Sequence, residues 1–178
     1  YLAATGPRDG RPQNRAALAV LFWGDHAEAA AHASLRKSLS NLRQEVGSHI
    51  AITRDDVMLV RECCTVDLWE FERLAAQGLA GSEQASLEAA AALYRGAFLA
   101  GFGVHAADDF EDWSRAQQER VRGLAVQVLA ALAAACAARG ESAPAIAAQH
   151  RILELEPWRE EAHRELMVLL GQNGQRSA

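Results

Sequence analysis

The stretch LRKSLSNLRQEV, residues 35–46, carries the clearest helical pattern in the sequence. Its apolar residues recur at i, i+4, i+7 and i+11, the spacing of one helix face: Leu35, Leu39, Leu42 and Val46. Gly47 follows them as a helix stop. The pattern predicts a helix over residues 29–46 that buries this face.

The opposite face of this predicted helix is polar and basic. With about 100° of rotation per residue, its positions run from those directly opposite the apolar face to those nearer one edge: Lys37, Gln44, Ser40, Asn41, Arg36 and Arg43. No acidic residue lies between His32 and Gln44. On an isolated helix such a face is most simply a solvated surface, so its meaning depends on the neighbouring elements.

Two short helices are predicted before it. Leu2–Thr5 is typical of a helix tail, and Gly6-Pro7 closes it. Asn14 is a suitable N-cap for a second helix, Arg15–Trp23, which Gly24-Asp25 ends.

A β-hairpin is predicted after the helix over residues 29–46. Residues 50–53 (IAIT) and 57–60 (VMLV) flank the polar turn 54–56. Two helices, a basic-faced helix and a hairpin form a winged helix-turn-helix, which we place at residues 1–61.

In a helix-turn-helix the second helix of the pair enters the major groove of DNA. The predicted DNA-binding residues are Ser34, Arg36, Lys37, Ser40, Asn41, Arg43, Gln44 and Arg54. Asn and Gln suit adenine and Lys suits guanine, whereas the two edge arginines suit phosphates. Arg54, at the hairpin tip, would reach the minor groove or the backbone.

The rest of the chain is predicted to be helical. The expected helices are Leu68–Gln77, Glu83–Leu99, Phe110–Arg139, Ala143–Leu155 and Glu160–Gln172. Gly140 and Gly174 lie 34 residues apart, and Pro157 stands where a tetratricopeptide repeat closes its second helix. Ala145 fits the small-residue position of such a repeat, although the aromatic expected near Gln149 is missing. We therefore expect an all-α, tetratricopeptide-like solenoid at residues 66–178.

Charge divides the chain in the same way. Residues 1–61 hold 8 basic and 6 acidic side chains, a balance of +2, whereas residues 62–178 hold 10 basic and 17 acidic, a balance of −7. The total of −5 therefore hides a basic N-terminal part. This asymmetry indicates two domains with different partners.

Several classes of protein are disfavoured. The longest apolar candidate, Leu124–Ala138, falls short of the roughly 18 residues that span a bilayer, and no signal-peptide order is visible, so we expect a cytoplasmic protein without membrane contact. The sequence has no P-loop, Rossmann glycine pattern, G-x-S-x-G or H-E-x-x-H. We expect no enzyme, cofactor or metal, and interpret His163 with Glu160 as a structural pair.

Other residues receive structural interpretations. Cys63, Cys64 and Cys136 lack disulfide or metal-ligand spacing and are expected to be reduced thiols used as small hydrophobic residues. The tryptophans are expected in cores: Trp23, Trp69, Trp113 and Trp158. The acidic cluster Asp108, Asp109, Glu111 and Asp112 is expected at a helix N-terminus, where the helix dipole favours it.

Four motifs resemble one family. ALAVLFWGD (residues 17–25) and ASLRKSLSNLR (residues 33–43) are similar to the second helix and the recognition helix of SARP-type bacterial regulators. YRGAFLAGF (residues 94–102) and LEP with EAHRELM (residues 155–157 and 161–167) resemble segments of the bacterial transcriptional activator domain, BTAD. From this resemblance we expect the sequence to begin inside the first helix of an OmpR-like winged domain, without its N-terminal sheet, and to end before the last repeat helices. Asn41 stands where a basic or apolar residue is expected, which bears on sequence preference.

The resemblance implies a sequence-specific DNA-binding transcriptional regulator, an activator, whose partners are double-stranded DNA and, through the repeat domain, RNA polymerase or a second copy of itself. The alternative is a protein-interaction module of a larger protein, with a winged helix that no longer reads DNA. Salt-dependent binding to duplex DNA separates these two hypotheses.

Overall fold

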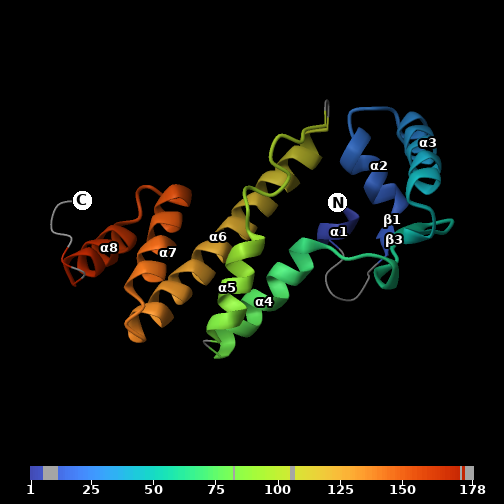
Figure 1. Cartoon of the computed structure of the whole chain (residues 1–178). Helices are drawn as coiled ribbons and strands as arrows, with labels where there is room; N and C mark the ends of the chain where they lie inside the picture. The colour runs from blue at the N-terminus through green and yellow to red at the C-terminus, as the bar shows by residue number, and fades with distance from the viewer. Residues whose placement is uncertain (6–11, 82, 105–106, 173, 175–178) are drawn as a thin grey trace. The chain divides into compact units, whose positions relative to one another are not determined.

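The computed structural model of the chain describes residues 1–5, 12–81, 83–104, 107–172 and 174. These residues are mainly helical, with one small antiparallel sheet, which confirms the predicted fold class (Figure 1). They divide into two compact units. Unit 1 comprises Tyr1–Trp69 and Leu99–Gln117, and unit 2 comprises Glu70–Phe98 and Gln118–Ala178. The predicted stop at Gly6-Pro7 lies outside the described residues.

Unit 1 contains the predicted helices and hairpin. Its complete elements are α1 (Leu2–Thr5), β1 (Gln13–Asn14), α2 (Arg15–Trp23), α3 (Glu28–Val46), the 3-10 helix η1 (Gly47–His49), β2 (Ile50–Ile52), β3 (Asp56–Leu59) and the 3-10 helix η2 (Arg61–Cys63). The first residues of two longer helices, up to Trp69 and from Asp108 to Gln117, also belong to it. The predicted helix over 29–46 is confirmed and starts one residue earlier. Gly47 ends it with a positive φ of 53°, a backbone conformation that favours glycine.

The sheet has one strand more than predicted. β2 and β3 pair antiparallel in the register Ile50↔Leu59 and Ile52↔Val57, as the hairpin requires. β1 pairs with the other edge of β3, so the strand order is β1-β3-β2. Asn14 belongs to β1 and also caps α2, because its side-chain oxygen accepts from the amides of Ala16 and Ala17.

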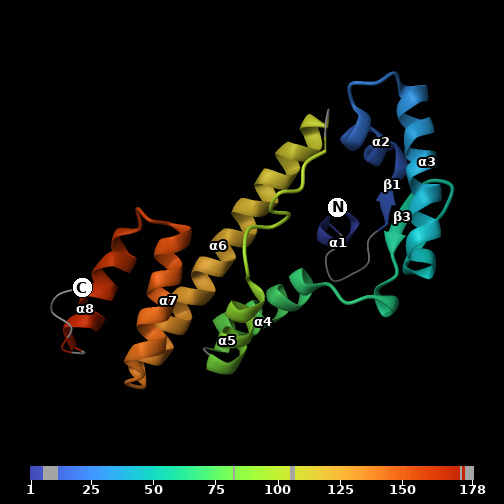
Figure 2. The ribbon, with the colours of Figure 1, turned by 45° about the horizontal axis from the view of Figure 1, so that its top comes forward.

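The core of unit 1 lies between α2, α3 and the sheet. Its buried side chains are Leu18, Ala19, Ala31, Leu35, Leu39 and Val57. Figure 2 shows α2 and the strands beside α3. The predicted burial of the whole apolar stripe is wrong at Leu42, which is 37% exposed because it lines an apolar cavity of this unit.

Unit 2 consists of helices. These are most of α4 (Asp67–Gly81), α5 (Gln84–Leu93), α6 (Asp108–Ala138) from Gln118 onward, α7 (Ser142–Leu155) and α8 (Glu160–Gln172). α8 has its predicted bounds, and α6 and α7 differ from prediction by one or two residues at their ends. α4 runs further than predicted, to Gly81. The acidic cluster does stand at a helix N-terminus, in the first turns of α6.

The prediction that a helix continues to Leu99 is wrong. α5 ends at Leu93, and Tyr94 turns out of the helix with ψ 94°. The ring of Tyr94 is buried against Phe71, at 6.0 Å between ring centroids. The carbonyls of Ala91 and Tyr94 both accept from Arg151, at 3.0 and 2.9 Å. These contacts from other helices provide hydrogen-bond donors for the carbonyls at the end of α5. Leu99, the predicted last residue of the helix, has a positive φ of 51°.

The repeat signals of α6 to α8 have structural counterparts. Gly140 and Gly174 both adopt left-handed conformations, at φ 76° and 75°. Ala145 is fully buried in α7, as the small-residue position requires. Gln149, where an aromatic was expected, is buried too, and its amide donates to the carboxylate of Glu165 on α8.

α6 is more apolar than the sequence reading allowed. It contains an 18-residue window of mean hydropathy 1.8, so by length and composition alone it could cross a membrane, and the expectation that no apolar stretch is long enough to do so is corrected. In the structure 44% of that window is buried. A core helix of a soluble protein meets the same criteria, and Val128 and Leu129 of α6 are among the most buried side chains of unit 2.

Two expectations about single residues need correction. Trp23, Trp69 and Trp113 are half-buried, and Trp69 donates from Nε1 to the carbonyl of Ala3 at 2.6 Å. Trp158 is wrongly predicted as a core residue: it lies in the turn between α7 and α8 and is 72% exposed. Among the three free cysteines, Cys136 is buried as expected, whereas Cys63 is exposed because η2 leaves its side chain at the surface.

Candidate nucleic-acid interface

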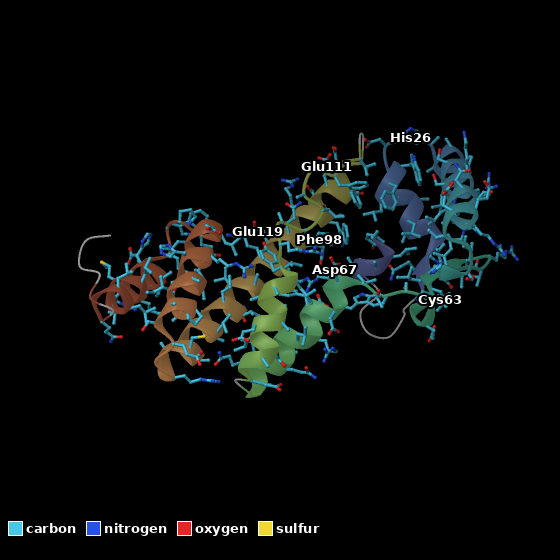
Figure 3. All side chains as sticks on the ribbon, viewed as in Figure 1. His26, Cys63, Asp67, Phe98, Glu111 and Glu119 are labelled. Carbon is cyan, nitrogen blue, oxygen red and sulfur yellow. The ribbon has the colours of Figure 1, made fainter. Side chains whose placement is uncertain are left out.

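The outer face of α3 carries the predicted contact residues. Six of the eight lie exposed on this helix: Arg36, Lys37, Ser40, Asn41, Arg43 and Gln44. Ser34, on the same helix, is half-buried. The buried side chains of α3 are Ala31, Leu35 and Leu39, so the helix separates a core face from a polar face as its period requires. Side chains project from this outer face in Figure 3.

The three cations of this face, Arg36, Lys37 and Arg43, form no ion pair within the described part of the chain. Near the start of α3, Nε2 of His32 lies 3.9 Å from the carboxylate of Glu28, a contact that is an ion pair only when the imidazole is protonated. The C-terminal end of α3 is closed by His49, whose Nδ1 lies 2.6 Å from the carbonyl of Val46. Positive charge on this face is therefore available to an external anion.

The eighth predicted residue, Arg54, lies at the tip of the hairpin. Its side chain is exposed, and the tip is a tight turn in which the amide of Thr53 donates to the carbonyl of Asp56 at 2.9 Å. Thr53 Oγ1 accepts from the amide of Asp56 at 3.0 Å. The structure thus places the contact candidates on two elements of one compact unit, α3 and the hairpin.

The sequence pattern does not predict the role of one residue in this region. Arg15 opens α2, yet its backbone amide donates to the carbonyl of Asp55 at 2.8 Å. Its Nη1 donates to the carbonyls of Thr53 and Arg54, at 3.0 and 3.3 Å. No local pattern relates residues 38 or 39 positions apart, so only the fold could show this contact.

Unit 1 also holds an apolar cavity of about 890 Å³. Leu42 and Val46, the end of the apolar stripe of α3, form part of its wall together with Leu2, Leu59 and Phe102. Three polar side chains of α3 and of η1, which follows it, also line the cavity: Ser38, Glu45 and His49. This cavity lies on the core side of the helix and therefore does not overlap the predicted DNA-contacting face.

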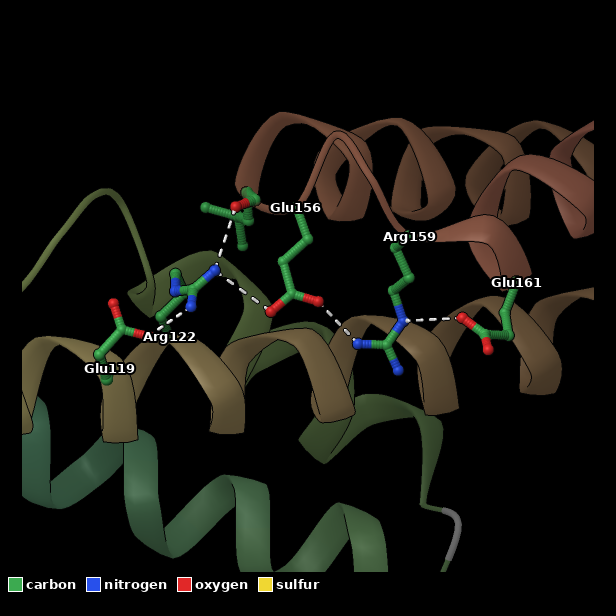
Figure 4. A network of polar contacts seen from close by, with 6 residues as sticks. Glu119, Arg122, Glu156, Arg159 and Glu161 are labelled. Atoms are coloured by element: carbon green, nitrogen blue, oxygen red, sulfur yellow. Dashed lines mark hydrogen bonds and ion pairs between the residues drawn. The ribbon is translucent and has the colours of Figure 1, made fainter.

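In unit 2, the LEP segment makes a polar network that ties the turn after α7 to α6 (Figure 4). The carboxylate of Glu156 accepts from Arg122 of α6 at 3.2 Å and from Arg159 at 2.8 Å. Arg122 also donates to the carbonyl of Leu155 at 3.4 Å and to Glu119. The glutamate of this motif therefore has a structural role that explains its place beside Pro157.

Among the described residues, no group of three or more His, Cys, Asp or Glu side chains could hold a metal ion. His163 contacts a backbone carbonyl, with Nε2 2.8 Å from the oxygen of Pro157. Its role is therefore in the α7–α8 turn.

Comparison with known families gives a match over the C-terminal part of the chain. The family described as "Bacterial transcriptional activator domain" matches residues 66–178. No curated protein matches the chain. Because the family match spans more than half of the chain, the protein belongs to the bacterial transcriptional activator domain family, and its role is regulatory.

Proposed function

We propose that this protein is a sequence-specific, DNA-binding transcriptional regulator of the SARP type, acting as an activator. One observation carries the proposal: the outer face of α3 is polar and basic, and its three cations have no ion-pair partner within the described residues. A helix of this kind fits the major groove and can present side chains to base edges. The family match supports a role in transcription.

The contacts are assigned by position on the helix. Lys37 and Gln44, directly opposite the buried face, would meet base edges together with Ser40 and Asn41. Arg36 and Arg43 lie nearer one edge and suit phosphate oxygens, which fix register without reading sequence. Ser34 would contact the sugar-phosphate backbone, and Arg54 would reach the minor groove or the backbone beside the major groove.

The test is binding of the whole chain to labelled duplex DNA, followed by fluorescence anisotropy over a range of salt concentrations. The variant Lys37→Ala/Arg43→Ala should abolish most of the affinity and reduce the slope of log K against log salt by about 2. Arg95→Ala/Arg164→Ala is the matched control, because it removes two exposed cations from unit 2. If the unchanged chain does not bind any duplex at low salt, the protein-interaction module becomes the better explanation.

The proposed recognition of a DNA sequence has its own test. Selection of binding sites from random duplexes should return a consensus, and Asn41→Ala should relax the preference at one base pair, at a cost of about 1–3 kcal/mol for its preferred site. Arg36→Ala should instead weaken binding to all sequences alike.

The remaining parts of the proposal concern the repeat domain. We propose that its tetratricopeptide-like helices contact RNA polymerase or a second copy of the chain, in the cytoplasm and without catalysis. The membership of residues 66–178 in a family of regulatory domains supports this division of labour. Co-purification with RNA polymerase and sedimentation of the free protein distinguish the two partners.

A further inference from the structure

The tip of the hairpin has two independent sets of hydrogen bonds. Its amides turn inward: those of Asp55 and Asp56 donate to Thr53 Oγ1, at 3.4 and 3.0 Å. Its carbonyls turn toward Arg15. Thr53, Arg54 and Asp55 are consecutive, and each of their carbonyls accepts a hydrogen bond from this one arginine.

The place of Arg15 in the fold explains how one residue reaches all three carbonyls. It follows Asn14, which pairs with Asp56 in the sheet and caps α2 in the same step. The start of α2 is therefore anchored beside the turn. The backbone amide of Arg15 takes one carbonyl, and its guanidinium takes the other two.

Arg15 and Arg54 consequently have different uses. The side chain of Arg15 is half-buried and directs Nη1 at two carbonyl oxygens, whereas the side chain of Arg54 is exposed, with no ion-pair partner among the described residues. A loop that is already ordered loses less conformational entropy when it binds. The contact that orders the tip thus acts on the arginine carried by it.

We propose that Arg15 is a positioning residue of the DNA interface: it holds the hairpin tip in the conformation that presents Arg54 to the backbone of a duplex bound by α3. The inference rests on the proposed function. It adds that the hairpin, which is the wing of the winged helix-turn-helix, is preformed in the free protein. It also adds that α2 both supports α3 in the core and positions the hairpin.

A double-mutant cycle tests the coupling, with the whole chain and a fluorescein-labelled duplex of mixed sequence at low salt. Arg15→Ala should weaken binding by about three- to tenfold. Arg54→Ala should weaken it by at least as much, and the double variant should be no weaker than Arg54→Ala alone. If the two losses add, Arg15 acts on DNA directly and the inference is overturned. Arg95→Ala is the control for loss of one charge.

Rescue distinguishes positioning from general stability. Arg15→Lys keeps a cation that can donate to carbonyls, and it should retain most of the affinity. If it binds as weakly as Arg15→Ala while both variants unfold at the same urea concentration as the unchanged chain, the carbonyl contact is not responsible and the inference fails. Arg15→Gln, which keeps a donor amide, replaces the alanine variant if that variant does not fold.

Hydrogen exchange tests the same contact without DNA. The amide of Asp56 should exchange at least severalfold faster in Arg15→Ala and recover in Arg15→Lys, while amides of α8 stay unchanged. Unchanged exchange of Asp56 overturns the inference even if the protein binds DNA. Failure of the unchanged chain to bind any duplex overturns the proposed function together with the inference, so the two failures are distinguishable.

Discussion

Replacing Gly78 by alanine is expected to destabilise the protein, although the same change usually strengthens a helix. Gly78 lies in α4, where it meets Leu87 of α5, a fully buried side chain. A Cβ built on Gly78 would stand 2.6 Å from Cδ2 and 2.7 Å from Cγ of Leu87, and 3.1 Å from its backbone nitrogen. The side chain has no room to rotate away, and the backbone nitrogen can move only with the helix.

The magnitude follows from two opposing effects. Overpacking of a filled core costs about 1–3 kcal/mol, and the clash with backbone as well as side chain points to the upper part of that range. Alanine in place of glycine favours a helix by about 1 kcal/mol. The net expectation for Gly78→Ala is a free energy of unfolding lower by about 1–2 kcal/mol.

Gly123→Ala is the matched control. Gly123 lies inside α6, and a Cβ built there meets no atom of another element within 4 Å. Only the helix preference remains, so this variant should gain about 0.5–1 kcal/mol. Urea unfolding followed by far-ultraviolet circular dichroism measures both, with the slope against urea checked for each variant. A stabilised Gly78→Ala, or equal shifts of both variants, would refute the packing explanation.

Three further measurements test two other contacts and the burial of one cysteine. Glu156→Ala removes the carboxylate that two arginines share and should lower the free energy of unfolding by about 1–3 kcal/mol in the same urea assay; an unchanged free energy of unfolding would contradict the network of Figure 4. The hydrogen bond from Gln84 holds the pKa of Glu141 below its ordinary value of 4.5, so its stabilising contribution is present above that pH and is lost as the pH falls through the lowered pKa. Gln84→Ala should raise the pKa of Glu141 in a carboxyl NMR titration, and an unchanged curve would contradict the contact. Burial raises the pKa of the Cys136 thiol, so iodoacetamide should label exposed Cys63 long before Cys136, as mass spectrometry would show; equal rates would contradict the burial of α6.

The bounds of α3 were predictable because their causes are local. The apolar spacing and Gly47 lie within the helix itself or next to it, and the observed helix differs from prediction by one residue. The end of α5 was not predictable in this way. Its alanine-rich sequence favours a longer helix. The helix nevertheless ends at Leu93, because Tyr94 is buried and its carbonyl accepts a hydrogen bond from Arg151, 57 residues further on.

The candidate site divides along the same line. Positions on the outer face of α3 follow from the helical period alone, so Lys37 and Gln44 could be placed without coordinates. Arg15 could not, because its contacts cross 38 and 39 residues. Trp158 shows the opposite error: a large aromatic side chain is usually buried, but its place in the short α7–α8 turn leaves it exposed.

The compact unit that holds α3 also takes in part of the stretch that matches the activator-domain family. Residues 99–117 lie within the match and belong to unit 1. Phe110 is buried there, with its ring 5.1 Å from that of Phe22 in α2, and Trp113 lies 4.8 Å from Tyr1. A fragment of residues 1–61 would lack these aromatic partners and expose the apolar side of α2. Since α2 packs on α3 and carries Arg15, the start of α6 supports the proposed DNA-binding surface from the core side. Binding experiments therefore require the whole chain, and a loss of DNA binding on truncation would report lost packing rather than lost contacts.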